Sequence, residues 1–410
     1  MPLIACYECD LLHRAIPLDQ GGRAYCRRCG ARLYQQVPGA LQRTVAFYLA
    51  ALICFFFANF YPFLSLKIGA RMETVHLIDA ARALSDAGMT LLGLLVLLTS
   101  LLIPLIMMVG HLYLLLPRLL WRVRPPACGW VFRNLRRLAP WSMVSIFMLG
   151  TLISVVKLLD LAEVIPGIGA GAFVVMMVLV AAAEASFDPH LIWPRDASPP
   201  APRPYASALA NGLVSCHYCA LLVEASRLDA HGRGTCPRCG GGLHLRKPDT
   251  IHRTWALLAA AALLLLPANL YPVMTVIRLG QGEPSTILGG VMHLAAAGMW
   301  GLALIVLFAS VVVPGLKLIA FSWILRTIHK RSPRRPVDRT RLYRLAEAVG
   351  AWSMVDVFVV ALLTALVQMG RLATIEPNLG ALFFAAVVVL TMLAAESFDP
   401  RLIWDNLPDP

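Results

Sequence analysis

The chain has 410 residues, of which 59% are hydrophobic and only 14% charged, and its formal net charge is +13. Soluble domains have about 25% charged residues, so this composition excludes an ordinary soluble protein and indicates a polytopic membrane protein. The positive charge lies mainly in short segments between apolar runs, which is typical of membrane topology and argues against nucleic-acid binding. No cleavable signal pattern precedes the first apolar run, which we expect to be an uncleaved anchor.

Residues 1–40 contain two Cys-x-x-Cys pairs with sixteen residues between them. Two such turns present four thiolates, which complete a closed tetrahedral site, so the segment is interpreted as a zinc ribbon. Zinc is favoured over a rubredoxin-like iron, and a redox-active dithiol is the alternative. Nearby histidines such as His13 are expected to be surface residues. The predicted ligands are Cys6, Cys9, Cys26 and Cys29.

Residues 41–193 are predicted to form a membrane unit of four helices. Each apolar run is long enough to cross about 30 Å of hydrocarbon. Between the first two spans, residues 67–88 are expected to form short helices at the outer interface, and 160–170 a tight turn. The predicted spans are 45–66, 89–116, 141–163 and 168–187.

The second half repeats this order. A Pro/Ala-rich linker at 194–210 leads to a second ribbon at 211–250 with the same cysteine spacing, and residues 251–410 form a second four-helix unit. Short interfacial helices are again expected, at 277–298. The predicted ligands are Cys216, Cys219, Cys236 and Cys239, and the spans are 255–276, 299–325, 349–370 and 379–398.

Several motifs recur at an offset near 210, among them Asn59-Phe-Tyr-Pro62 as Asn269-Leu-Tyr-Pro272. The predicted fold is therefore an all-α polytopic membrane protein with two tandem four-helix units, each preceded by a ribbon. An even number of spans keeps both ribbons and both termini on one side. Arginines crowd the segments 118–137 and 326–344, so the positive-inside rule places that side in the cytoplasm.

Ionisable residues lie within the predicted spans of the second half. A charged residue near a bilayer centre costs about 3 kcal/mol on insertion scales, so Lys317 and Asp356 are expected to face each other in a polar cavity. Two interpretations remain open: interhelical pairing, or a transport pathway or proton-linked switch. Further polar candidates are Ser310, Ser353 and Thr391, and in the first half Lys157 and Asp160.

The duplicated ribbons, Asn-x-Tyr-Pro and Ser-Phe-Asp-Pro-x-Leu-Ile-Trp resemble the paraquat-inducible protein A family, which includes PqiA-like and LetA-like inner-membrane proteins of Gram-negative bacteria. The resemblance implies tetraspanin-like membrane units, a location in the bacterial inner membrane and a role in outer-membrane integrity. It also implies a partner, a periplasmic MCE-domain hexamer that forms a lipid tunnel, and phospholipid as cargo. The seven intramembrane polar residues named above match the network implied for the family.

These features predict a non-enzymatic lipid transport component with two zinc ions. No phosphate-binding Gly-x-x-x-x-Gly-Lys-Ser/Thr loop is present, so ATP does not drive transport through this chain. The alternatives are a membrane scaffold or metal-dependent sensor that anchors the tunnel, and a membrane dithiol redox enzyme.

Overall fold

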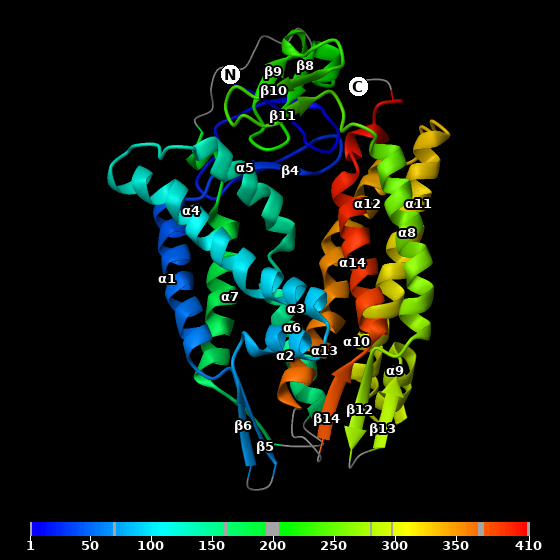
Figure 1. Cartoon of the computed structure of the whole chain (residues 1–410). Helices are drawn as coiled ribbons and strands as arrows, with labels where there is room; N and C mark the ends of the chain where they lie inside the picture. Colours follow the sequence, from blue (N-terminus) through cyan, green and yellow to red (C-terminus); the bar gives the residue numbers. More distant parts are fainter. Residues whose placement is uncertain are drawn as a thin grey trace.

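The computed structural model describes residues 2–68, 71–158, 163–193, 205–278, 281–296, 298–367 and 373–407. Within these ranges, eight helices are long and apolar enough to cross a membrane. They form an elongated bundle with the cysteine ribbons at one end and small β-sheets at the other (Figure 1). We call these the ribbon end and the sheet end. The chain is therefore mostly helical, with two tandem halves that each begin with a cysteine cluster, as predicted.

The two membrane units contain equivalent helices. In each unit the second span is interrupted by a π-helical turn and the third by a 3-10 turn. Unit 1 contains α1 (Ala40–Phe60), α3 (Thr90–Leu97), α4 (Ile103–Leu120), α5 (Cys128–Leu138), α6 (Val144–Leu158) and α7 (Ile168–Ser186). Unit 2 contains α8 (Thr250–Leu270), α10 (Trp300–Leu307), α11 (Val313–His329), α12 (Pro336–Gly350), α13 (Val355–Leu366) and α14 (Leu379–Ser397).

A repeated proline explains the π-helical turns at Leu98–Leu102 and Phe308–Val312. Pro104 and Pro314 are the second residues after these turns and have no backbone N–H to donate, so the preceding helix widens locally instead of breaking. Within the second turn, the Ser310 hydroxyl donates to the Val306 carbonyl oxygen at 2.6 Å. Ser310 is thus bonded to its own helix.

The third spans begin earlier than predicted. Helix extends from Cys128 in unit 1 and from Pro336 in unit 2, through segments that were expected to be arginine-rich loops. The reason is amphipathic spacing: Cys128, Phe132 and Leu135 are buried on one face of α5, while its arginines lie on other faces. The arginines therefore occupy helical positions at the ribbon end.

The expectation of helices across 67–88 and 277–298 is wrong for the first part of each segment. β5 (Leu64–Ile68) pairs with β6 (Arg71–Val75) and β7 (Glu163–Pro166), and β12 (Met274–Arg278) pairs with β13 (Gln281–Ser285) and β14 (Ala373–Pro377). The short helices α2 (Asp79–Asp86) and α9 (Ile287–Ala296) follow. The signal for the strand is the alternation of residue type in the sequence, with apolar Leu64 and Leu66 next to polar Ser65 and Lys67. In the structure Ser65 is buried as well, and Lys67 is exposed.

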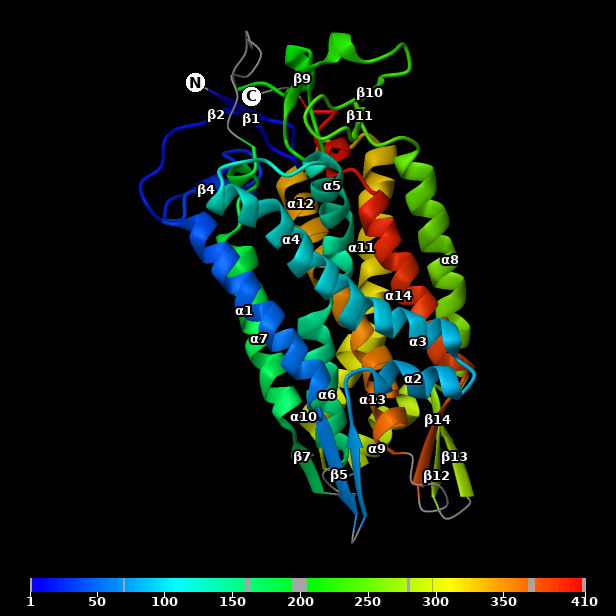
Figure 2. The same cartoon turned by 60° about the vertical axis from the view of Figure 1, so that its left-hand side comes forward.

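The two membrane units meet along α6 and α13 (Figure 2). Phe147 and Phe358 stack edge to face with ring centroids 5.3 Å apart. A Cβ at Gly150 would lie 2.9 Å from Phe358 Cβ, so this close approach requires glycine. Nearly every residue of α13 is buried, which makes α13 the central helix of the bundle.

The ribbons are built from short hairpins, and their strands are β1 (Leu3–Ala5), β2 (Leu12–Arg14), β3 (Arg23–Tyr25), β4 (Arg32–Gln35), β8 (Leu213–Ser215), β9 (Leu222–Glu224), β10 (Arg233–Thr235) and β11 (Gly242–His244). Most of the predicted linker, 194–204, lies outside the described residues. Its last part runs along ribbon 1, where the Ala208 N–H donates to the Asp10 carbonyl oxygen at 2.7 Å. Leu12, Leu213 and Leu222 join the two ribbons in one small apolar core.

Candidate metal centres and intramembrane polar site

The structure brings the eight predicted cysteine ligands together in two buried clusters. In each cluster the four sulfur atoms lie within 4.8 Å of one another. The paired sulfurs are 3.5 Å (Cys6, Cys29) and 3.4 Å (Cys9, Cys26) apart in ribbon 1, and 3.6 Å apart in both pairs of ribbon 2. Tetrahedral zinc with Zn–S bonds of about 2.3 Å needs sulfurs about 3.8 Å apart, so the clusters fit such an ion after a small expansion.

Backbone turns hold the sulfurs in place. In the second turn of ribbon 1, the Cys26 N–H donates to the Ala31 oxygen at 2.7 Å and the Gly30 N–H to the Cys26 oxygen at 2.9 Å. Gly30 has a φ of 74°, which glycine adopts without steric cost. The first turns use non-glycine residues in the same left-handed conformation, Asp10 at 62° and Ala220 at 54°.

The donor set indicates a structural metal site. All four tetrahedral positions belong to cysteine, which leaves no open position for a substrate or water. All eight cysteines are free thiols and buried, and four thiols packed this closely resist joint ionisation unless a cation is bound. Hydrogen bonding to Cys26 and Cys29 accordingly raises the pKa of Cys6 above its ordinary value.

His13 was missed by sequence reasoning, which placed it on the surface. The side chain is buried, and its Nε2 lies 3.3 Å from Cys26 Sγ. Histidine is therefore positioned to hydrogen bond a ligand sulfur of ribbon 1. The equivalent position of ribbon 2 is Val223, so comparison of the two halves could have singled out His13 as a difference between the metal centres.

Each ribbon packs on the membrane unit of the other half. Ribbon 1 shares an apolar core with α11, α12 and α14 of unit 2, and ribbon 2 shares one with unit 1. Arg344 of α12 donates to the Cys29 carbonyl oxygen at 2.8 Å and to the Glu8 carboxylate at 2.7 Å. Arg133 of α5 donates to the Cys239 carbonyl oxygen at 3.1 Å. The two contacts are equivalent by the repeat.

The Leu-Ile-Trp motifs take part in the same exchange. The guanidinium carbon of Arg28, in ribbon 1, lies 4.8 Å from the ring centroid of Trp404 in unit 2. The guanidinium carbon of Arg238, in ribbon 2, lies 5.8 Å from that of Trp193 in unit 1. Such cation–π contacts contribute about 0.5–2 kcal/mol each, depending on desolvation. Each repeated tryptophan therefore contacts the arginine that precedes the last cysteine ligand of the ribbon packed on its membrane unit.

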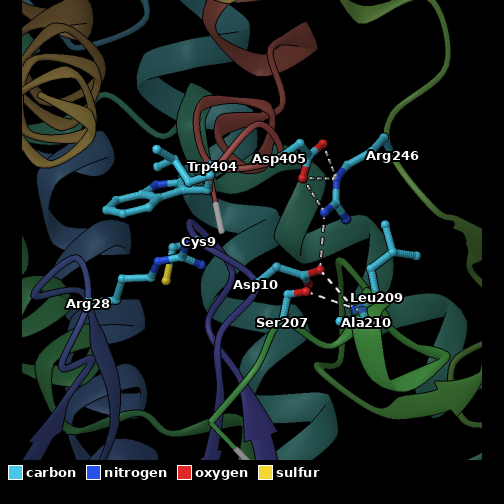
Figure 3. A pocket seen from close by; sticks show the side chains of 10 residues that line it. Cys9, Asp10, Arg28, Ser207, Leu209, Ala210, Arg246, Trp404 and Asp405 are labelled. Carbon is cyan, nitrogen blue, oxygen red and sulfur yellow. Dashed lines mark hydrogen bonds and ion pairs between the residues drawn. The ribbon is translucent and has the colours of Figure 1, made fainter. Parts of the chain in front are cut away.

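A pocket of about 350 Å³ lies where ribbon 1, the last part of the linker, the end of ribbon 2 and the C-terminal segment meet (Figure 3). Arg246 crosses it, with Nη2 3.2 Å from Asp10 Oδ2 and 2.6 Å from Asp405 Oδ1. Burial lowers the pKa of Arg246, but the Asp405 and Asp10 carboxylates outweigh it and hold the pKa above its ordinary value. This ionic cluster links both ribbons to the C-terminal segment.

In the second half, Lys317 lies inside the bundle with 3% of its surface exposed. Its ammonium donates to Thr391 Oγ1 at 3.0 Å, so α11 and α14 are bonded within the membrane. Ser353 is 1% exposed, and within the described part of the chain its hydroxyl has no hydrogen-bond partner. The structure thus brings together two of the polar candidates, Lys317 and Thr391, a pairing that the sequence analysis did not specify.

The remaining polar candidates are placed less closely. Asp356 is the second residue of α13 and is half-buried. Among the ion pairs of the described residues, none joins it to Lys317, and their facing one another stays a prediction. Lys157 lies near the end of α6, but its side chain and all of Asp160 are outside the described residues.

Gly350 was also missed, although the repeat contains its signal. A Cβ at Gly350 would lie 3.0 Å from Lys317 Nζ and 3.5 Å from its Cε, so the glycine makes room for the ammonium. In the first half, Met107 stands at the position of Lys317 and Ala139 at that of Gly350. The lysine and the glycine occur together in unit 2 and are absent together from unit 1.

Eight candidate spans in two repeats, with one buried four-cysteine cluster before each repeat, define a polytopic membrane protein with paired four-cysteine ribbons. Comparison with known proteins then identifies its relatives. The chain belongs to the paraquat-inducible protein A family, which matches residues 41–196 and 251–408, once in each half. The duplication inferred from the motifs is thereby confirmed.

The relatives align over almost the whole chain. It is 35% identical to the intermembrane transport protein PqiA of Escherichia coli (strain K12), covering 99% of this chain and 96% of that protein. It is 30% identical to the lipophilic envelope-spanning tunnel protein A of the same strain, covering 98% and 90%. A probable intermembrane transport protein of Haemophilus influenzae is 26% identical over 98% and 95%. No solved structure matches the chain, so the tetraspanin-like likeness stays a prediction.

Proposed function

We propose that this protein is the membrane component of an intermembrane lipid transport system in the bacterial inner membrane. It loads phospholipid into, or accepts it from, a periplasmic MCE-domain hexamer that forms a tunnel to the outer membrane. The names of the relatives support intermembrane transport. The arginine-rich ribbon end supports a cytoplasmic location for both ribbons and both termini, which leaves the sheet end for the periplasmic partner.

The observation that carries this proposal is the buried ammonium of Lys317. A cation at this depth is costly in an apolar bundle, and such residues mark substrate or ion pathways. Its hydrogen bond to Thr391 at 3.0 Å satisfies one of its three donors. The buried Ser353 hydroxyl, without a hydrogen-bond partner among the described residues, adds a further donor. An ammonium with unused donors suits a transient anionic group such as a lipid phosphate.

Asp356 supplies the second part of the proposed mechanism. A carboxylate on a membrane span changes charge when it binds a proton, and that change alters its interaction energy with a buried cation. A proton moving onto and off Asp356 would bias two arrangements of the central helix α13 relative to α11, which carries Lys317. The chain would thereby couple the proton gradient to lipid movement.

The two zinc ions of this proposal have a structural role. The residues that would hold them are the eight clustered cysteines, and bound zinc would contribute folding energy to the small ribbons. The redox alternative is not favoured, because a reactive dithiol is typically accessible and these thiols are buried in matched sets of four.

Replacing Asp356 with Asn tests the coupling directly. Transfer of a fluorescent phospholipid from proteoliposomes to the reconstituted tunnel partner should be abolished, while the variant stays folded and partner-bound. Asp338→Asn is the matched control, because this carboxylate is exposed at the start of α12. Wild-type transfer by the Asp356 variant would refute the proton coupling. Loss of partner binding instead would favour an anchoring scaffold.

A further inference from the structure

Each ribbon makes the same contact with the membrane unit of the other half. In each, the carbonyl oxygen of the last cysteine ligand accepts a hydrogen bond from an arginine of the opposite membrane unit, Arg344 to Cys29 and Arg133 to Cys239. Neither arginine belongs to the ribbon that it contacts. The contact therefore joins a metal centre to a membrane helix of the other half.

The charge of a loaded centre favours this contact. A divalent cation with four thiolates has a net charge of −2. The arginines also lie close to the glycine that follows the last ligand: a Cβ at Gly30 would be 4.0 Å from Arg344 Nη1, and one at Gly240 would be 3.4 Å from Arg133 Nη1. Guanidinium groups close to the ligands stabilise the dianionic centre and are held by it in return.

Close packing adds to the electrostatic link. A Cβ at Gly129 of α5 would lie 3.0 Å from Cys239 Cα, so this helix rests directly on the last ligand of ribbon 2. On ribbon 1, Glu8 is buried between two ligands and forms an ion pair with Arg344. Any expansion of a cluster on metal loss would displace backbone that the opposite membrane unit contacts.

We propose that metal binding to each ribbon stabilises the packing of that ribbon on the opposite membrane unit, and so holds the two membrane units together. Arg344 and Arg133 are the positioning residues that link metal binding to this packing, which we call docking. The proposal rests on metal occupancy of the ribbons and is independent of lipid transfer. Linkage makes the effect reciprocal: if docking stabilises the loaded centre, removing the arginine must weaken metal binding, and removing the metal must weaken docking.

The first test measures metal affinity in the purified full-length protein. Metal content is determined by mass spectrometry, and zinc release to a chromogenic chelator is then followed for Arg344→Gln and for the control Arg341→Gln, an exposed arginine three residues away on α12. Changes to residues around a metal site typically weaken binding about 10–100-fold. We expect about tenfold weaker binding at one of the two sites in R344Q and wild-type release in R341Q.

Arg344→Lys controls for folding. It keeps the positive charge and one donor for the Cys29 oxygen but loses the fork that engages Glu8, so most of the metal affinity should return. Equal affinities in R344Q, R341Q and the wild type would overturn the proposal, as would metal-free ribbons in a folded protein.

The second test removes the metal and measures docking. Hydrogen exchange is recorded in nanodiscs before and after chelation, with the sheet-end helices as an internal reference. We expect exchange to rise in the ribbons and also around Arg133 in α5 and Arg344 in α12, which belong to the membrane units. Faster exchange confined to the ribbons would overturn the proposal. Lipid transfer is not measured, so either outcome leaves the transport function to be judged separately.

Discussion

Replacing Gly350 with Ala tests the polar site of unit 2 with a single methyl group. The new Cβ would lie 3.0 Å from Lys317 Nζ, closer than ordinary contacts, and 3.5 Å from Cε. Gly350 has an ordinary helical φ of −57°, so alanine is not strained by its backbone. The methyl group must therefore shift the lysine ammonium by a few tenths of an ångström. We expect this shift to weaken the hydrogen bond to Thr391.

The expected size follows from two opposing effects. A hydrogen bond from a charged group contributes about 1.5–3 kcal/mol, whereas alanine in place of glycine stabilises a helix by up to about 1 kcal/mol. We therefore expect G350A to lower the free energy of unfolding by about 1–2 kcal/mol. Lipid transfer should fall as well, because the ammonium no longer occupies its position between α11, α12 and α14.

Gly315→Ala is the matched control. Gly315 lies two residues before Lys317 on α11, and a Cβ there would meet no atom within 4 Å. The control should be neutral or slightly stabilising and should keep full transfer. Thermal unfolding in detergent and transfer from proteoliposomes check both variants. If G350A unfolds and transports like G315A, the placement of the Lys317 ammonium against Gly350 is refuted.

Two further changes test the ribbon end. Cys29→Ser should lower the metal content of the purified protein from two ions to one, whereas Cys54→Ser, outside both clusters, should retain two; unchanged content in C29S would contradict the four-cysteine site. Asp399→Asn tests a pH dependence: burial raises the pKa of Asp399, but hydrogen bonds from Arg401 outweigh it and hold the pKa at about 2, below its ordinary value of 3.8. The stabilisation, about 2 kcal/mol, is present above about pH 4 and lost as the pH falls through 2. The difference in unfolding free energy between wild type and D399N should become smaller as the pH is lowered from 6 to 3. The control is Asp188→Asn, because residue 190 is a histidine where the second half has Arg401. A difference that is independent of pH would contradict this account.

The parts that sequence reasoning predicted are those with local signals. A Cys-x-x-Cys turn fixes two ligands within four residues, so both clusters follow from spacing. Apolar length gives the spans and their number. Lys317 stands out because a lone charge among valines and leucines is costly anywhere in a membrane.

The parts that were missed depend on contacts between distant segments. Ile165 of β7 lies opposite Ser65 of β5, which is a hundred residues earlier in the chain. No local pattern in either segment therefore predicts this strand pairing. Ribbon 1 packs on the membrane unit of the other half, where Arg344 donates to the Cys29 carbonyl oxygen. The spacing of the cysteines does not predict which membrane unit a ribbon packs on. The start of the third spans was misplaced because arginines on α5 and α12 were assigned to loops, although their apolar neighbours recur with helical spacing.

The most direct test of the central claim, that the buried cation of unit 2 takes part in lipid transport, is the transfer rate of Lys317→Met. Methionine is the residue that unit 1 carries at this position, as Met107, so the substitution converts one half to the pattern of the other. With Met107→Leu as the matched control and equal amounts of folded, partner-bound protein, K317M should transfer phospholipid at least about tenfold more slowly, the equivalent of losing about 1.4 kcal/mol of stabilisation at the rate-limiting step. Transfer by K317M at the rate of the control would contradict the account.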